Sequence, residues 1–174
     1  MTFTARLLKR TLGVIALAFV ACTAASAAPS APAGYLFVTF KNGGEATAEQ
    51  IYFGLSSDGR NWQALNGAEP VLTSTIGDRG VRDPYLLRAH DGTGFYLIAT
   101  DLSMHNTRDW KKAVREGSRA IIIWQSPDLV TWSAPRRVEV APKDAGCTWA
   151  PEAVYDEEKG DYLVYWASTT KGDD

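Results

Sequence analysis

The chain has 174 residues, of which 45% are hydrophobic and 22% are charged, a composition that is ordinary for a folded domain and excludes an intrinsically disordered protein. The formal net charge is −2 and no basic patch or nucleic-acid motif is present, so nucleic acid is not expected as a partner. Aromatic residues make up 11% of the chain, and aromatic side chains suit surfaces on which sugar rings stack.

The first 27 residues predict a secretory signal peptide. Three cations between residues 6 and 10 precede an apolar segment, residues 11–22, and Ala25-Ser26-Ala27 is a cleavage site of the small-residue type. The apolar segment is too short for an ordinary membrane-spanning helix. Cleavage leaves 15 Lys and Arg against 20 Asp and Glu, a net charge of about −5. The mature protein is therefore expected to be secreted, either extracellular or periplasmic.

Residues 19–22, Phe-Val-Ala-Cys, resemble a bacterial lipobox, although Phe19 stands where leucine is usual. Lipidation at Cys22 is therefore the alternative to cleavage after Ala27, and no contact with a membrane is expected without it. After cleavage at Ala27, Cys147 is the remaining thiol. Because a lone cysteine has no internal disulfide partner, Cys147 is expected to be buried and inert.

Residues 28–34, rich in Pro, Ala and Ser, predict a linker, and the folded domain is expected at 35–174. This region contains short β-branched and aromatic runs separated by turns, as all-β proteins do. Residues 108–115 predict one or two helical turns, with Trp110, Ala113 and Val114 on a shared face. Strands are expected at residues 35–40, 51–56, 70–73, 80–87, 95–100, 120–124, 137–140, 149–155 and 162–168, with 120–124 buried on both faces.

An internal repeat joins these elements. Residues 56–62 and 126–132 each place Ser, Asp and Trp at the same spacing after a strand. Residues 84–97 and 151–163 each begin with a proline before one strand and end with Tyr-Leu in the next. The offset is about 66 to 70 residues with about four strands per unit, which is typical of β-propeller blades. The sequence therefore predicts an all-β propeller, of which this chain holds about the first two to three blades.

Asp83 is the first candidate for a functional residue. It directly precedes Pro84 at the beginning of a predicted strand, and a residue before proline is restricted toward extended backbone. A carboxylate held in this way can point into a cleft. Aspartate before proline also often caps a turn, so the spacing by itself leaves both explanations open.

Four motifs, taken together and in order, carry a family resemblance. The sequence resembles glycoside hydrolase family 43, the five-bladed propeller enzymes that act on arabinose- and xylose-containing plant polysaccharides. The resemblance covers nearly all of residues 35–168 and implies a cell-wall polysaccharide or oligosaccharide as the substrate. The motifs are residues 80–85 (Gly-Val-Arg-Asp-Pro-Tyr), 95–101, 124–132 and 146–152, the last ending in Trp-Ala-Pro-Glu.

The resemblance implies that Asp83 is the general base of an inverting hydrolase. Inverting enzymes keep their two working carboxyl groups about 6.5 to 9.5 Å apart, so that a water fits between. The family's general acid and its second aspartate come from later blades, and neither has a match before Asp174. We therefore expect this chain to be an N-terminal part that is inactive, or nearly so, by itself. Glu152 is expected to be a carboxylate at the cleft rim, bonded to backbone or to an arginine, rather than the proton donor.

Three further residues are candidates for substrate binding. Trp149 is expected either to stack on a sugar ring or to pack between blades. Arg82 is expected to pair with Asp83 or to remain solvated at the strand edge, and Asp101 is a candidate for the cleft wall. His90 and His105 lack metal-ligand spacing, so no metal is expected, and no motif for a cofactor is present.

Two other functions remain open. A non-catalytic or degenerate carbohydrate-binding propeller would keep the aromatic cleft without the acid. A related five-bladed family that hydrolyses fructans is the third possibility, but there the motif is Asn-Asp-Pro, and Arg82 stands in the Asn position.

Overall fold

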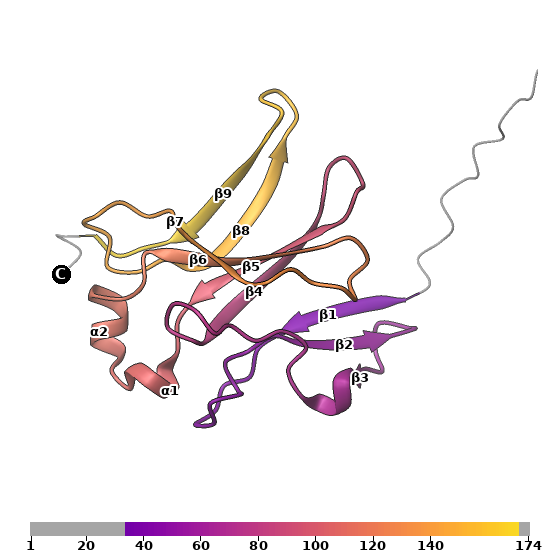
Figure 1. Cartoon of the computed structure of the whole chain (residues 1–174), viewed down its shortest axis with the longest axis horizontal. Helices are drawn as coiled ribbons and strands as arrows, with labels where there is room; N and C mark the ends of the chain where they lie inside the picture. The colour runs from indigo at the N-terminus through magenta and orange to yellow at the C-terminus, as the bar shows by residue number, and fades with distance from the viewer. Residues whose placement is uncertain (1–33, 171–174) are drawn as a thin grey trace, which may run out of the picture. The chain divides into compact units, whose positions relative to one another are not determined.

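The computed structural model describes residues 34–170, in which β-strands predominate (Figure 1). The expected signal peptide (residues 1–27), the possible lipidation site at Cys22 and the expected linker up to residue 33 lie outside the described residues. Within residues 34–170, none of the helices has the length and apolar character needed to cross a membrane.

The strands form three consecutive antiparallel sheets. The first sheet contains β1 (Tyr35–Thr39), β2 (Tyr52–Ser56) and β3 (Gln63–Ala64), in that order. The second contains β4 (Val81–Arg88), β5 (Phe95–Asp101), β6 (Ala120–Ser126) and β7 (Arg136–Glu139). The third pairs β8 (Trp149–Asp156) with β9 (Asp161–Ala167). Three short helices lie in the connections: η1 (Asn66–Ala68), α1 (Met104–Thr107) and α2 (Trp110–Arg115).

Eight of the nine predicted strands are present, and the prediction for residues 70–73 is wrong. There, Leu72 forms an isolated bridge to Ile51, and no ladder extends from it. Pro70 has no N–H to donate, and beyond Ile51 the edge of β2 is already paired with β3. The short strand β3 was not predicted from the sequence.

The Ser-Asp repeat is a structural repeat. Between β2 and β3, the Ser56 hydroxyl accepts from the N–H of Gly59 at 2.8 Å, and one oxygen of Asp58 accepts from the N–H groups of residues 60 and 61, both at 2.8 Å. Between β6 and β7, Ser126 and Asp128 bind the N–H groups of residues 129, 130 and 131 in the same way, at 2.8, 2.9 and 2.7 Å. These donors lower the pKa of both aspartates. Strands β2 and β6 therefore hold the same position in successive sheets.

Strand β4 contains a bulge at its proline. The register passes from Arg82 opposite Thr100 to Tyr85 opposite Ile98, so that Asp83 and Pro84 together face a single residue of β5. Asp83 has φ 47°, so the prediction of an extended backbone at this residue is wrong. Because proline cannot donate to the ladder, it is accommodated in a bulge, and the residue before it takes a positive φ instead of continuing the strand.

Strand β8 repeats this bulge. The register passes from Trp149 opposite Ala167 to Glu152 opposite Tyr165, and Ala150 before the proline has φ 48°. An alanine rarely adopts a positive φ, whereas aspartate does so more easily. The two bulges show that β4 and β8 are equivalent first strands of their sheets.

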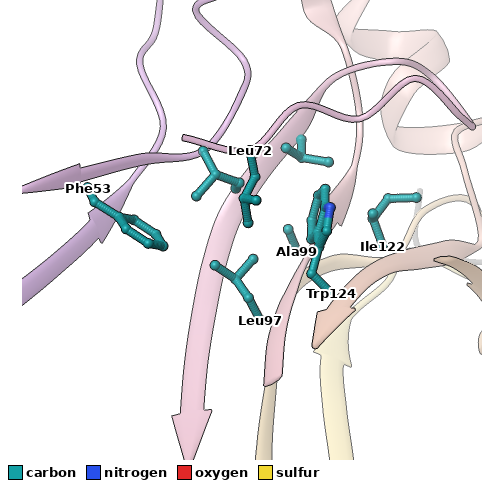
Figure 2. Close-up of a cluster of buried hydrophobic side chains, with 8 residues drawn as sticks. Phe53, Leu72, Leu97, Ala99, Ile122 and Trp124 are labelled. Carbon is teal, nitrogen blue, oxygen red and sulfur yellow. The ribbon is translucent and has the colours of Figure 1, made fainter. Parts of the chain in front are cut away.

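A buried hydrophobic cluster joins the first and second sheets (Figure 2). Strand β6 is buried on both faces over most of the predicted stretch, since Ala120, Ile121, Ile122 and Trp124 are all at most 1% exposed and Ile123 is partly buried. Figure 2 shows Trp124 between Ala99 and Ile122. The cluster consists of Ile51, Phe53 and Leu72 before β4, and of Val81, Leu97, Ala99, Ile122 and Trp124 in the second sheet.

Aromatic contacts attach the third sheet to the second at the turn between β4 and β5. The ring of His90 stacks on Tyr155 with centroids 3.8 Å apart, and the His90 N–H donates to the Tyr162 hydroxyl at 2.7 Å. Tyr162 also meets Tyr96 of β5 edge to face, at 5.7 Å. Aromatic side chains therefore attach the third sheet to the second at this end.

Candidate functional site

Asp83 lies partly buried in the bulge of β4, and one of its oxygens is held by a buried hydroxyl. Thr100 Oγ1 donates to Asp83 Oδ2 at 3.1 Å. The same oxygen of Thr100 accepts from the backbone N–H of Ala150 at 2.8 Å. Because a hydroxyl carries one proton and its acceptor position is used by Ala150, the proton of Thr100 is directed to Asp83. The fully buried Thr100 side chain therefore links the Asp83 carboxylate in the bulge of β4 to the backbone of the bulge in β8.

The repeat identifies the residue that corresponds to Asp83 in the next sheet. Asp83 and Ala150 both precede a proline, both have a positive φ and both bind Thr100. Glu152 lies two residues further along β8 and corresponds to Tyr85. Glu152, the carboxylate of the Trp-Ala-Pro-Glu motif, therefore does not hold in β8 the position that Asp83 holds in β4.

Neither prediction for Arg82 is confirmed, since it does not pair with Asp83 and its side chain is only 12% exposed rather than solvated. Its Nη1 lies 3.1 Å from Glu49 Oε1. The Glu49 side chain is only 3% exposed, and its other oxygen accepts from Ser103 Oγ at 3.0 Å and from the His105 N–H at 2.9 Å. A buried carboxylate requires a charged partner, whereas the more exposed Asp83 does not, so Glu49 takes the guanidinium.

Glu49 is a site residue that the sequence did not indicate. It precedes the β2 run as a single acidic residue in a polar segment, and nothing in that pattern distinguishes a buried carboxylate from a solvated one. Arg82 also donates to Asn42 Oδ1 at 2.5 Å and lies 4.8 Å from the centre of the Phe40 ring. The arginine is therefore fixed from several sides.

Trp110 is a second site residue that the sequence did not single out. The helical turn predicted within residues 108–115 is present as α2, in which Ala113 is buried while Trp110 is 54% exposed. The Trp110 ring turns toward Arg82, whose guanidinium lies 5.2 Å from the ring centre, and toward Trp149. The centroids of the two tryptophan rings are 6.3 Å apart, and the rings are nearly perpendicular, at 84°.

Glu152 is an exposed carboxylate, and its partner is a tyrosine. The hydroxyl of Tyr165, its cross-strand neighbour in β9, donates to Glu152 Oε2 at 2.7 Å. This bond raises the pKa of Tyr165. Glu152 is exposed, and Tyr165 stands in place of the expected backbone or arginine partner.

Asp101 does not line a cleft, contrary to prediction. Its side chain has no exposed surface and accepts from Arg137 Nε at 2.9 Å, Ser118 Oγ at 2.7 Å and the Asp78 N–H at 2.8 Å. These partners satisfy a carboxylate in the interior and leave no access for a substrate. Asp101 is therefore a structural residue that joins the end of β5 to three other segments.

Beside this network lies a pocket of about 410 Å³ with polar walls that include Asp78, Asn106, Lys112 and Glu116. The pKa of Asp78 is raised, mainly because the side chain is partly buried and also because the negative charge of Asp101 lies nearby. Asp83 is not among the residues that line this pocket.

Cys147 is buried as predicted, with its sulfur 4.0 Å from Thr169 Oγ1. In the part of the chain that the structure describes, no three His, Cys, Asp or Glu side chains are grouped so as to hold a metal ion.

The chain is similar to an α-L-arabinofuranosidase of Bifidobacterium longum subsp. longum, with 33% identity over 154 residues. The alignment covers 81% of this chain but only 14% of the length of that enzyme.

The fold is similar to the crystal structure of an exo-β-1,3-galactanase from Phanerochaete chrysosporium bound to β-1,3-galactotriose. The TM-score is 0.52 and the identity 13%, over 80% of this chain and 31% of that one. At this identity the likeness concerns the fold alone. It confirms the predicted fold class, in which the successive sheets are the first blades of a β-propeller.

Residues 31–174 match the family model of a probable glycosyl hydrolase domain related to family 43. The match includes both bulged strands, the Thr100 bridge and the Ser-Asp turns. The resemblance found in the sequence is thus confirmed, and the chain belongs to the family of glycosyl hydrolase domains related to glycoside hydrolase family 43.

Proposed function

We propose that this protein hydrolyses glycosidic bonds in arabinose- or xylose-containing plant polysaccharides by an inverting mechanism, with Asp83 as the general base. The observation that carries the proposal is the Asp83 carboxylate, held in the β4 bulge by the Thr100 hydroxyl at 3.1 Å. Family membership supports glycoside hydrolysis, and the similarity to an arabinofuranosidase supports a pentose-containing substrate.

In the proposed reaction, ionised Asp83 takes a proton from a water molecule. The water oxygen forms a bond to the anomeric carbon on the face opposite the leaving oxygen, and the bond from carbon to the leaving oxygen breaks. A general acid protonates that oxygen, so that water is divided between the two products. The bond from Thr100 keeps one oxygen of Asp83 occupied and leaves the other to hold the water.

The general acid in this proposal comes from a carboxyl group in a later blade. Glu152 is not proposed for this role, because its carboxylate accepts a hydrogen bond from the Tyr165 hydroxyl. General acid–base catalysis contributes about 10²- to 10⁴-fold in rate. The 174-residue chain without a partner acid is therefore proposed to be inactive or nearly so.

The test is turnover of an aryl arabinofuranoside and of arabinoxylan by the full-length gene product that contains this chain. Asp83→Asn should lower kcat by roughly 10²-fold or more, whereas Asp144→Asn, an exposed aspartate in another loop, should not change it. NMR of the first sugar released should show the inverted anomer. Undiminished turnover by Asp83→Asn, or a product of retained configuration, would overturn the mechanism, and measurable turnover by the 174-residue chain would overturn its proposed inactivity.

A second candidate function is carbohydrate binding without catalysis. It is favoured by one observation, the exposed Trp110 beside Trp149 next to the bulged strands. Under this alternative, the full-length protein would bind arabino- or xylo-oligosaccharides and release no sugar from them.

We also propose that the protein is exported, since the signal pattern in residues 1–27 supports this location and polysaccharides are outside the cell. The expected result is an intact mass, measured in the secreted or periplasmic fraction, that matches a chain beginning at residue 28. Recovery in the membrane fraction with the mass of a lipid at Cys22 would favour the lipoprotein alternative.

A further inference from the structure

Trp110 is exposed, and α2 packs onto the domain through a different residue. Ala113 is 1% exposed and is the buried residue of α2, whereas 54% of Trp110 reaches solvent. A short helix that used its largest apolar side chain for packing would bury that side chain instead. Trp110 therefore leaves a large apolar surface available beside the site.

We propose that Trp110, together with Trp149, forms a sugar-binding subsite that takes the apolar C–H face of one ring of the glycan. This inference rests on the proposed function, and it assigns a substrate contact to a residue of α2, an element outside the β-sheets. The ligand class is a neutral pentose- or hexose-containing oligosaccharide, since flat aromatic rings contact C–H groups and leave the hydroxyls in water.

The ring of Trp110 is held in place before any ligand binds. The Asp109 side chain caps α2 by accepting from the Lys112 N–H at 3.1 Å. This cap fixes the start of the helix, and therefore the backbone of its first residue, Trp110. The Arg82 guanidinium lies 5.2 Å from the ring centre, and the buried Glu49 holds that guanidinium. A ring that is already ordered loses little conformational entropy when a ligand binds.

The two tryptophan rings also form a corner. With centroids 6.3 Å apart and planes at 84°, one ring stands upright beside the other, so that a sugar can contact both. Trp149 is partly buried and Trp110 is exposed, so Trp110 offers the larger free surface of the two.

The corner is tied to the candidate base through the chain. The Trp110 ring lies beside the side chains of Arg82 and Trp149, which directly precede Asp83 and Ala150. Asp83 and Ala150 in turn share the Thr100 hydroxyl. The proposed subsite therefore adjoins the two bulges that the Thr100 hydroxyl joins at Asp83 and Ala150.

The experiment measures binding of arabinotriose and xylotriose by calorimetry in the Asp83→Asn form of the full-length protein, so that no bond is cleaved. Trp110→Ala should weaken binding of the better ligand about 10-fold. The matched control is Trp62→Ala, since Trp62 is also exposed, at 46%, but packs on Phe37 in the first sheet. This variant should bind within about 2-fold of the parent, and Trp110→Phe, which keeps a flat ring, should retain most of the affinity.

Unchanged affinity in Trp110→Ala, or no binding of either trisaccharide by the parent, overturns the inference. If Trp110→Ala fails to fold, Trp110→Leu replaces it, because leucine keeps apolar volume without a flat face; failure of both to fold assigns Trp110 to packing and overturns the inference as well. Binding that depends on Trp110 in a protein without turnover leaves the inference intact while the proposed hydrolysis fails. Turnover that depends on Asp83 but not on Trp110 would support the proposed hydrolysis and overturn the inference about Trp110.

Discussion

At the residue scale, the site depends on a few polar atoms with more than one partner. Thr100 serves Asp83 and Ala150 with a single hydroxyl, and Glu49 serves Arg82, Ser103 and the His105 N–H with one carboxylate. A buried group that loses such a partner retains the cost of leaving water. Substitutions at these residues should therefore affect stability and site geometry together.

Replacing Thr100 by valine keeps the shape of the side chain and removes the hydroxyl. The Ala150 N–H then has no partner, and Asp83 loses the bond that orients it. We expect Thr100→Val to lower the free energy of unfolding by about 1–3 kcal/mol in urea titrations. Thr100→Ser, which keeps the hydroxyl, is the control and should lose less. Equal losses in the two variants would mean that methyl packing, not the hydroxyl, makes this residue important.

Asp78 should oppose folding at neutral pH. Burial and the Asp101 charge raise its pKa above the ordinary 3.8, so the folded protein keeps a proton at pH values where the unfolded chain has lost it. The contribution of Asp78 to stability is therefore largest at low pH and is lost as the pH rises through the folded-state pKa.

Asp78→Asn removes the charge without changing the size of the side chain. At about pH 7 this variant should unfold at higher urea concentration than the parent, and the gain should shrink as the pH falls and the parent becomes protonated as well. Asp144→Asn, at an exposed position, should show no such trend. A gain that grows as the pH falls would contradict the assignment.

At the element scale, the Ser-Asp turns and the proline bulges recur in successive sheets. In each Ser-Asp turn one hydroxyl and one carboxylate satisfy several backbone N–H groups. All of these bonds lie within three residues along the chain, so the turn is encoded locally. This locality explains why the repeat could be recognised from the sequence.

Ser56→Ala and Ser126→Ala should destabilise the protein by similar amounts, about 1 kcal/mol each, because each removes the same acceptor from equivalent turns. Thermal unfolding followed by circular dichroism measures both. Ser57→Ala, an exposed serine in the first turn, is the matched control and should be neutral. A large loss in one turn and none in the other would show that the two turns are not equivalent in energy.

At the scale of the whole molecule, the core around Trp124 connects the first sheet to the second. Trp124 is 1% exposed and lies in one cluster with Phe53 of β2 and Leu97 of β5. Trp124→Ala should cost about 3–5 kcal/mol, because it removes a large buried side chain and leaves a cavity. Loss of β-sheet signal and of tertiary signal should coincide in urea, since both sheets share the cluster.

Trp62→Ala, at an exposed position on the first sheet, provides the comparison and should cost much less. A Trp124→Ala protein that unfolds in two separate steps would indicate that the sheets are stable independently of each other.

The sequence by itself determined the features whose causes are local. Strand runs follow from alternating apolar residues, the Ser-Asp turns from bonds within three residues, and the burial of β6 from its continuous hydrophobicity. The order of the motifs also carried the family. Asp83 could be selected in this way because its proline is adjacent to it.

The tertiary structure decided which distant residues meet. Glu49 and Arg82 are separated by 33 positions and Thr100 and Ala150 by 50, and Trp110 of α2 meets Trp149 of β8. The sequence shows that these residues are polar or aromatic but not how the strands that carry them are placed side by side. The bulge at Asp83 is decided in the same way, because a residue before proline can continue a strand or leave it, and only the pairing of β4 with β5 selects between the two.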